Sequence, residues 1–200
     1  QLGDRVAAIF ERNAGHYAMR LCVGTVNAST NRITWGSNAN NWSTDGDGIG
    51  GSIIGDVVWD AGNSRVVCVG TVYGSNTFGS SAWTGIAAVG SLSGSGTSAE
   101  ATFGSMVAIQ GNSKYTRNPK LYYDSANGKV VVTYTDNSYT ADQNVIAGQV
   151  GTVSGTSISF GSVTRTTIHS NDDGDAVYNP DTGLGNTSWR EASTNYWWVM

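Results

Sequence analysis

Two clusters of acidic residues are the first candidates for chemistry in this sequence. Asp45 and Asp47 alternate with glycines, and Asp172, Asp173 and Asp175 surround another glycine. Carboxylates spaced beside glycine resemble the oxygen ligands of calcium loops, but neither cluster follows the twelve-residue calcium-loop pattern. We therefore expect solvated turns and no cofactor, with calcium binding as the alternative.

Motifs for catalysis are otherwise sparse. The histidines are His16 and His169, and the sequence contains neither Gly-x-Ser-x-Gly nor His-Glu-x-x-His. A glycoside hydrolase needs two carboxyl groups that face each other across a pocket. The candidates for such a pair, whose separation the sequence leaves open, are Asp45, Asp56, Asp172 and Asp175. We expect a protein that is not an enzyme, with a polysaccharide-degrading enzyme as the alternative.

Aromatic residues in polar, irregular stretches form a third set of candidates. Such a ring can cover the apolar C–H face of a sugar while neighbouring Asn, Asp and Ser side chains supply hydrogen bonds. The alternative is that these rings pack against the body of the protein. The candidate ligand-binding residues are Trp42, Tyr73, Trp83, Lys114, Tyr115, Arg117, Tyr139 and His169.

The composition predicts the kind of scaffold that must position these residues. Charged residues make up 13% of the chain, about half of ordinary usage, and the polar remainder is mostly Ser, Thr and Asn. No stretch shows the apolar period of an amphipathic helix with a capping signal, so we expect an all-β protein. The net charge of −4 argues against nucleic acid as a partner. The absence of an apolar run of about 18 residues argues against membrane insertion.

The stretch 121–162 defines the strands most clearly. Four β-branched or aromatic runs, separated by Gly, Asn and Ser, are typical of strands joined by turns. We name them strands A to D, and they occupy residues 121–124, 129–134, 145–153 and 157–162.

The rest of the sequence repeats this stretch. The basic residue that opens strand B recurs at Arg5, Arg65 and Lys129, and the glycine of strand C recurs at Gly24, Gly90 and Gly151, a period of about 63 residues. The repeat divides residues 1–200, taken as one repeat domain, into units at 1–37, 56–105, 120–162 and 176–200. In the last unit we expect an insertion at 184–195, followed by strand B at 196–200.

Four antiparallel strands cannot bury either face alone, so we expect a β-propeller-like array of four-stranded antiparallel blades. Unequal numbers of the strand types suggest a partial ring or a fragment of a longer chain. The A–B and C–D turns should lie at one end of the blades, and the longer B–C and D–A connections at the other. The expected D–A loops are 38–55, 106–119 and 163–175.

Repeated aromatic positions should form the core between blades. We expect this of the strand D positions and of the strand A positions, and we expect both cysteines to be buried, unpaired thiols. These residues are Trp35, Phe103 and Phe160, then Trp59, Tyr123 and Tyr178, and finally Cys22 and Cys68.

Three phrases carry a resemblance to a known group of proteins: residues 123–132, 150–162 and 178–183. They resemble repeats in the tail-fibre and other virion-surface proteins of tailed phages. The resemblance implies a propeller-like β domain on the extracellular surface of a virion, with a structural and adhesive role. The implied partners are host cell-surface polysaccharide and other virion subunits or copies of the chain itself. A purely architectural, subunit-joining module is a further alternative.

Overall fold

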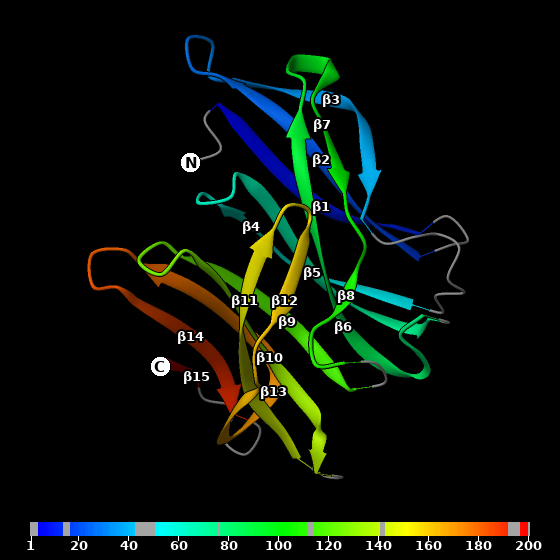
Figure 1. The fold of residues 1–200 in the computed structure, drawn as a ribbon, viewed down its shortest axis with the longest axis vertical. Helices are drawn as coiled ribbons and strands as arrows, with labels where there is room; N and C mark the ends of the chain where they lie inside the picture. The colour runs from blue at the N-terminus through cyan, green and yellow to red at the C-terminus, as the bar shows by residue number, and fades with distance from the viewer. Residues whose placement is uncertain are drawn as a thin grey trace.

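The computed structural model describes residues 4–13, 17–42, 51–75, 77–111, 114–140, 143–191 and 197–199. These residues form antiparallel strands joined by turns, together with one short 3-10 turn, η1 (Gly96–Ser98). The all-β prediction is therefore confirmed. Figure 1 shows the strands gathered into successive groups along the long axis, from β1–β3 at the top to β13–β15 at the lower left.

The first two groups are separate sheets. The first sheet has the order β1-β2-β3, made of β1 (Arg5–Asn13), β2 (Tyr17–Asn27) and β3 (Arg32–Asn41). In the second sheet β4-β5-β6-β7 follow in order and β8 also pairs with β6. Its strands are β4 (Gly51–Asp60), β5 (Arg65–Ser75), β6 (Gly79–Ser93), β7 (Glu100–Phe103) and β8 (Val107–Ala108).

The last two groups share one strand. The third sheet comprises β9 (Thr116–Asp124), β10 (Lys129–Thr140), β11 (Gln143–Ser154) and β12 (Ser157–Phe160). The fourth comprises β13 (Thr164–Asn179), β14 (Leu184–Glu191) and β15 (Trp197–Val199). The first part of β13 pairs with β11, and its second part pairs with β14. The third and fourth sheets are therefore continuous through β13.

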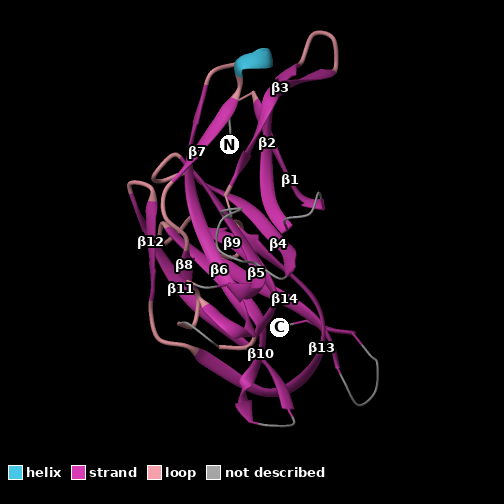
Figure 2. Ribbon diagram, turned by 90° about the vertical axis from the view of Figure 1, so that its right-hand side faces the viewer, coloured by secondary structure: helices cyan, strands magenta, loops and turns pink. Residues whose placement is uncertain are grey.

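The core lies between neighbouring sheets. Val66 and Cys68 of β5 point into a cluster shared with Leu21 of the first sheet. Val67 and Val69 point the opposite way, into a cluster shared with the third sheet. Since side chains alternate along a strand, the unbroken apolar run of β5 buries both faces of the second sheet. In Figure 2, β11 and β12 of the third sheet lie at the left, and β1–β3 of the first sheet lie at the upper right.

Hydrogen bonds at repeated positions join each sheet to the next. The N–H of Gly62 donates to the hydroxyl of Tyr123 at 2.9 Å, and one unit later the N–H of Ala126 donates to the hydroxyl of Tyr178 at 3.3 Å. Arginines at the start of strand B donate forward to glycine carbonyls in the next C–D turn. Arg5 reaches Gly94 at 2.8 Å, and Arg65 reaches Gly155 at 2.9 Å.

Two expectations about strand positions were wrong. Residues 184–191 are not an insertion but β14, the strand B of the last unit, and β15 pairs with β14 in the place of strand C. The segment lacks the valines of β5 because Gly185 replaces Val66, and a Cβ there would collide with the hydroxyl of Tyr122.

The expected D–A loops are also partly strand. The loops 38–55, 106–119 and 163–175 include strand residues in each case, because strand D pairs in two parts with strand C. In the second sheet β7 pairs with the end of β6, and β8 pairs with residues 86–87 of β6. The sequence did not reveal the second part of strand D, because that part is short or rich in polar residues.

Most of the expected core aromatics are packed. Trp59 and Phe103 contact the first core cluster, and Tyr123 and Phe160 contact the second. Tyr178 is partly buried and stacks on Tyr122. Trp35 is 41% exposed, because none of the described strands covers the outer face of the first sheet. Both cysteines are free thiols; Cys68 is buried, while Cys22 is only partly buried.

The repeated glycine of strand C makes room for the aromatic of strand D, and this generates a prediction. A Cβ on Gly90 would lie 2.8 Å from Phe103 Cε1 and 3.1 Å from Val66 Cγ1. Gly90→Ala should therefore lower the free energy of unfolding by about 1–3 kcal/mol, the usual cost of overpacking, measured by denaturant titration.

Gly24→Ala is the matched control at the same repeat position. Its Cβ would meet Ile33 and Trp35, but both side chains are half exposed and can move aside. Equal destabilisation by the two variants would contradict the importance of packing between sheets.

Candidate functional site

The connections between strands fall at two opposite ends of the sheets. Hairpin turns 61–64, 125–128, 155–156 and 180–183 lie at what we call the turn end. The B–C and D–A connections lie at the other end, which we call the loop end, because successive strands are antiparallel. The candidate ligand-binding residues come from segments at the loop end.

Four of these residues form two pairs, Tyr73 with Trp83 and Tyr115 with Arg117, and we call the two pairs together the aromatic cluster. Tyr73 and Trp83 are direct partners across β5 and β6, with ring centroids 5.2 Å apart and planes at 36°. The guanidinium carbon of Arg117 lies 5.2 Å from the centroid of the Tyr115 ring. That distance is within the range of a cation–π interaction.

Tyr115 links the cluster to two sheets. Its neighbour in an isolated antiparallel bridge is Thr84, the residue after Trp83. Its carbonyl oxygen accepts a hydrogen bond from the N–H of Asn137 in β10, at 3.0 Å. The aromatic cluster therefore crosses the junction between the second and third sheets. Tyr73 is 38% exposed, and Trp83, Tyr115 and Arg117 are partly buried, so the rings are fixed yet accessible.

The other candidates have different surroundings. Trp42 is only 2% exposed and packs in the first core cluster, so its faces are not available to a ligand. Lys114 is exposed beside Tyr115. The side chain of Tyr139 lies outside the described residues.

His169 reaches the loop end but not the aromatic cluster. It pairs with Val145 on β11, which pairs with Asp136 on β10, which in turn pairs with Thr116 on β9. Three strand spacings separate His169 from the strand that follows Tyr115, about 14 Å. A single sugar ring on Tyr115 would not reach it.

A buried carboxylate supports the aromatic cluster from behind. Asp136 is fully buried and accepts hydrogen bonds from Arg165 Nε at 2.7 Å and from Ser138 Oγ at 2.6 Å. The N–H of Ser138 donates to the same carboxylate at 2.8 Å. Gln110 contacts Arg165, Ser138 and Thr116 at 3.4–3.5 Å. These contacts join the chain just before Tyr115 to β10 and β13.

Hydrogen bonding sets the protonation state of this carboxylate. Burial alone would raise the pKa of Asp136, but hydrogen bonds from Ser138, Gln110 and Arg165 together hold the pKa below its ordinary value. Asp136 is therefore ionised at neutral pH. Sequence reasoning missed this residue, although one signal was present: Asp136 stands where the second unit has the buried Val72.

Most of the acidic candidates lie outside the described residues. Asp45 and Asp47 lie outside the described residues, as do the side chains of Asp172 and Asp173, while Asp175 is exposed. Among the described residues no group of three His, Cys, Asp or Glu side chains could hold a metal ion. Likewise, in the part of the chain that the structure describes, no helix is long and apolar enough to span a membrane.

Asp56, considered above as a catalytic acid, has a structural role. Its Oδ1 accepts the N–H of Val57 at 2.7 Å, and its Oδ2 accepts the N–H of Leu121 in the next sheet at 3.0 Å. Burial raises its pKa, and the nearby charge of Asp175 adds to this effect. Since both oxygens are bound to backbone, Asp56 ties β4 to β9.

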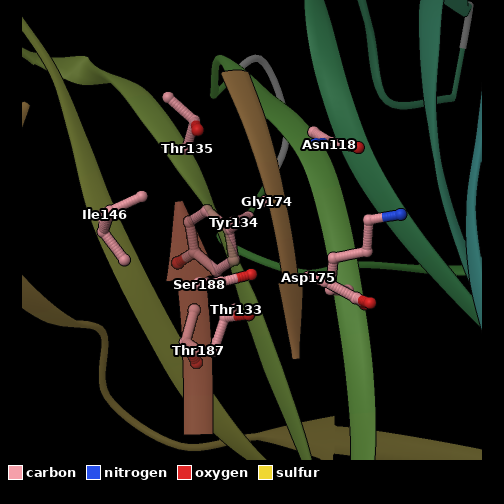
Figure 3. Close-up of a pocket in the computed structure, with 10 residues that line it drawn as sticks. Asn118, Thr133, Tyr134, Thr135, Ile146, Gly174, Asp175, Thr187 and Ser188 are labelled. Atoms are coloured by element: carbon pink, nitrogen blue, oxygen red, sulfur yellow. The ribbon is translucent and has the colours of Figure 1, made fainter. Parts of the chain in front are cut away.

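A small cavity lies between the third and fourth sheets. In Figure 3, Thr133 and Tyr134 of β10 face Thr187 and Ser188 of β14 across it, with Asp175 at one side. Its volume of about 10 Å3 holds a single water molecule. This cavity is therefore too small for a sugar, and the partly exposed aromatic cluster remains the candidate site.

In comparisons with known proteins, no family model matches the chain, and no curated protein matches it.

The buried carboxylate generates a prediction about acid stability. Because the folded-state pKa of Asp136 is lowered, its ionisation stabilises the fold above the unfolded pKa of about 4, and this contribution disappears as the pH falls through the folded pKa. Asp136→Asn should cost about 2–3 kcal/mol at pH 7. The difference from wild type should shrink toward pH 3, as measured by denaturant unfolding across that pH range.

Glu11→Gln is the control, because it neutralises an exposed carboxylate on β1. Its unfolding free energy should follow that of wild type at every pH. A constant gap between Asp136→Asn and wild type from pH 7 to pH 3 would show that the charge of Asp136 is not what stabilises the loop end.

Proposed function

We propose that this chain is a non-enzymatic adhesion domain that binds polysaccharide through the aromatic cluster at its loop end. The observation that carries the proposal is that the Tyr73–Trp83 pair and the Tyr115–Arg117 pair lie at one end of two neighbouring sheets, joined by the backbone bridge between Thr84 and Tyr115. Interior aromatics need no such arrangement, because they fill space between sheets. Partly exposed aromatic rings with a cation beside one of them suit a polar ligand that has apolar faces.

The chemistry of the cluster favours an extended carbohydrate. Ring faces stack on sugar C–H groups, and the cations of Lys114 and Arg117 can pair with acidic sugars or phosphate substituents. The surface is open, and the nearby cavity holds only one water molecule. An open surface suits a polymer that lies across it, whereas small molecules are usually enclosed by a pocket.

We further propose that the stacked sheets form part of a propeller-like array. In support, the strands in position A lie beside one another, β4 against β9 and β9 against β13. The hydrogen bonds from each A–B turn to the next strand A tyrosine recur from unit to unit. This arrangement would place all the loop-end connections on one rim, where binding residues on rigid scaffolds usually lie.

The cellular setting follows from the sequence resemblance. Similarity of residues 123–132, 150–162 and 178–183 to repeats of tailed-phage surface proteins supports a place on the extracellular surface of a virion. Host cell-surface polysaccharide is then the partner that the aromatic cluster would meet. Other virion subunits, or further copies of the chain, would hold the domain in place.

The proposal is tested with an array of purified bacterial capsular and O-chain polysaccharides. Wild type should bind one or a few of them saturably. Trp83→Ala and Tyr115→Ala should each weaken binding about threefold to tenfold, the loss expected for one stacking contact. Trp35→Ala is the matched control, since Trp35 is an exposed ring on a different surface; its affinity for soluble oligosaccharide should equal that of wild type.

Unchanged binding by the Trp83→Ala/Tyr115→Ala double variant would exclude the aromatic cluster as the binding surface. Absence of binding to every polysaccharide would instead favour the architectural alternative. Release of oligosaccharides during incubation would identify the polysaccharide-degrading enzyme.

A further inference from the structure

The outer face of the first sheet is apolar and uncovered, although the same face is buried in the next two units. Ile33 is 45% exposed, whereas Ala101 and Ile158 at its repeat position are 2% and 5% exposed. Val26 is 38% exposed, whereas its counterpart Val153 is 7% exposed. We call this surface the leading face, and its exposed members are Phe10, Val26, Ile33 and Trp35.

The outer face of the fourth sheet is also exposed, although the same face is buried in the first two sheets. Val199 is 70% exposed, whereas Leu21 and Ala87 at its repeat position are completely buried. We call this surface the trailing face. It includes Val177 and Val199, which line a shallow cavity of about 190 Å3 with Asn186 and Ser188, and also Leu184.

In the interior of the protein, these two kinds of face cover each other. The second sheet buries Val67 and Val89 on its trailing side against Val130 and Ile158 on the leading side of the third sheet. The leading face of the first sheet is thus built to receive a trailing face, and the trailing face of the fourth sheet to receive a leading face. The repeat itself specifies what covers each surface.

The charges of the two end segments are complementary. Residues 5–41 contain four arginines and one acidic residue, and residues 164–191 contain five acidic residues and two arginines. At long range, the first sheet of one copy would therefore attract the fourth sheet of another, whereas two first sheets or two fourth sheets would repel each other.

We propose that the leading face of one copy of this chain docks on the trailing face of a second copy, so that the protein associates head to tail. The contact is heterologous, using two different surfaces, and it extends the stacking of sheets from one copy to the next. This inference is independent of polysaccharide binding, because both faces lie away from the aromatic cluster.

Two single variants, each blocking one face, test this proposal by sedimentation velocity over a concentration series. Wild type should form dimers or larger species. Trp35→Asp and Val177→Asp should each weaken association at least tenfold, because a buried aspartate in the contact is left without a partner. An equimolar mixture should form a 1:1 dimer, because the first variant keeps an intact trailing face and the second keeps an intact leading face.

Val150→Asp is the control, since Val150 is an exposed valine of the third sheet outside both faces; it should associate like wild type. Thermal melts followed by circular dichroism establish that each variant is folded, and Ile33→Asp with Val199→Asp provides a second pair. A monomeric wild type at all concentrations would overturn the proposal. So would wild-type association by either face variant, or a mixture of the two that stays monomeric.

Discussion

A sheet that is apolar on both faces must be covered on both faces, and this requirement governs the whole molecule. The second sheet shows it most clearly, because Val66 and Cys68 face one neighbour while Val67 and Val69 face the other. Burying one such valine contributes about 1.5–3 kcal/mol, so the core clusters outweigh every polar contact between sheets. A single unit of this kind has no stable isolated form, and stacking is the consequence.

The polar contacts between sheets determine orientation more than stability. A hydrogen bond such as that from Gly62 to the Tyr123 hydroxyl contributes about 1 kcal/mol, but it forms only if one sheet is correctly placed on the next. Its recurrence between Ala126 and Tyr178 fixes the same relation for the following pair. Apolar surfaces alone are tolerant of rotation, whereas these directional contacts select one arrangement. The loop ends of successive sheets are thereby brought together, which is why Tyr115 can bridge to Thr84 of β6.

The strands with alternating or continuous β-branched residues could be predicted from the sequence, because their pattern follows directly from burial. Strand β14 could not, since its partners demand Gly185 and its outer face carries Asn186 and Ser188. At the site, the sequence placed Tyr73, Trp83, Tyr115 and Arg117 in connections at one end, but only the structure shows that they form two pairs. The structure also buries Trp42 away from these residues. The sequence could not show this, because composition does not distinguish a buried loop tryptophan from an exposed one. The Asp136–Arg165 pair joins residues 29 positions apart, a distance in sequence over which no local pattern acts.

Strand β13 belongs to two sheets at once, and this has a mechanical consequence. Its first part is held by β11 and its second part by β14, so tension between the third and fourth sheets passes along one continuous strand. Backbone hydrogen bonds on both parts would have to shear together before the sheets separate. The second and third sheets share no such strand among the described residues, because β8 ends at Ala108 and β9 begins at Thr116. Under a pulling force, the last two sheets would therefore move as one block.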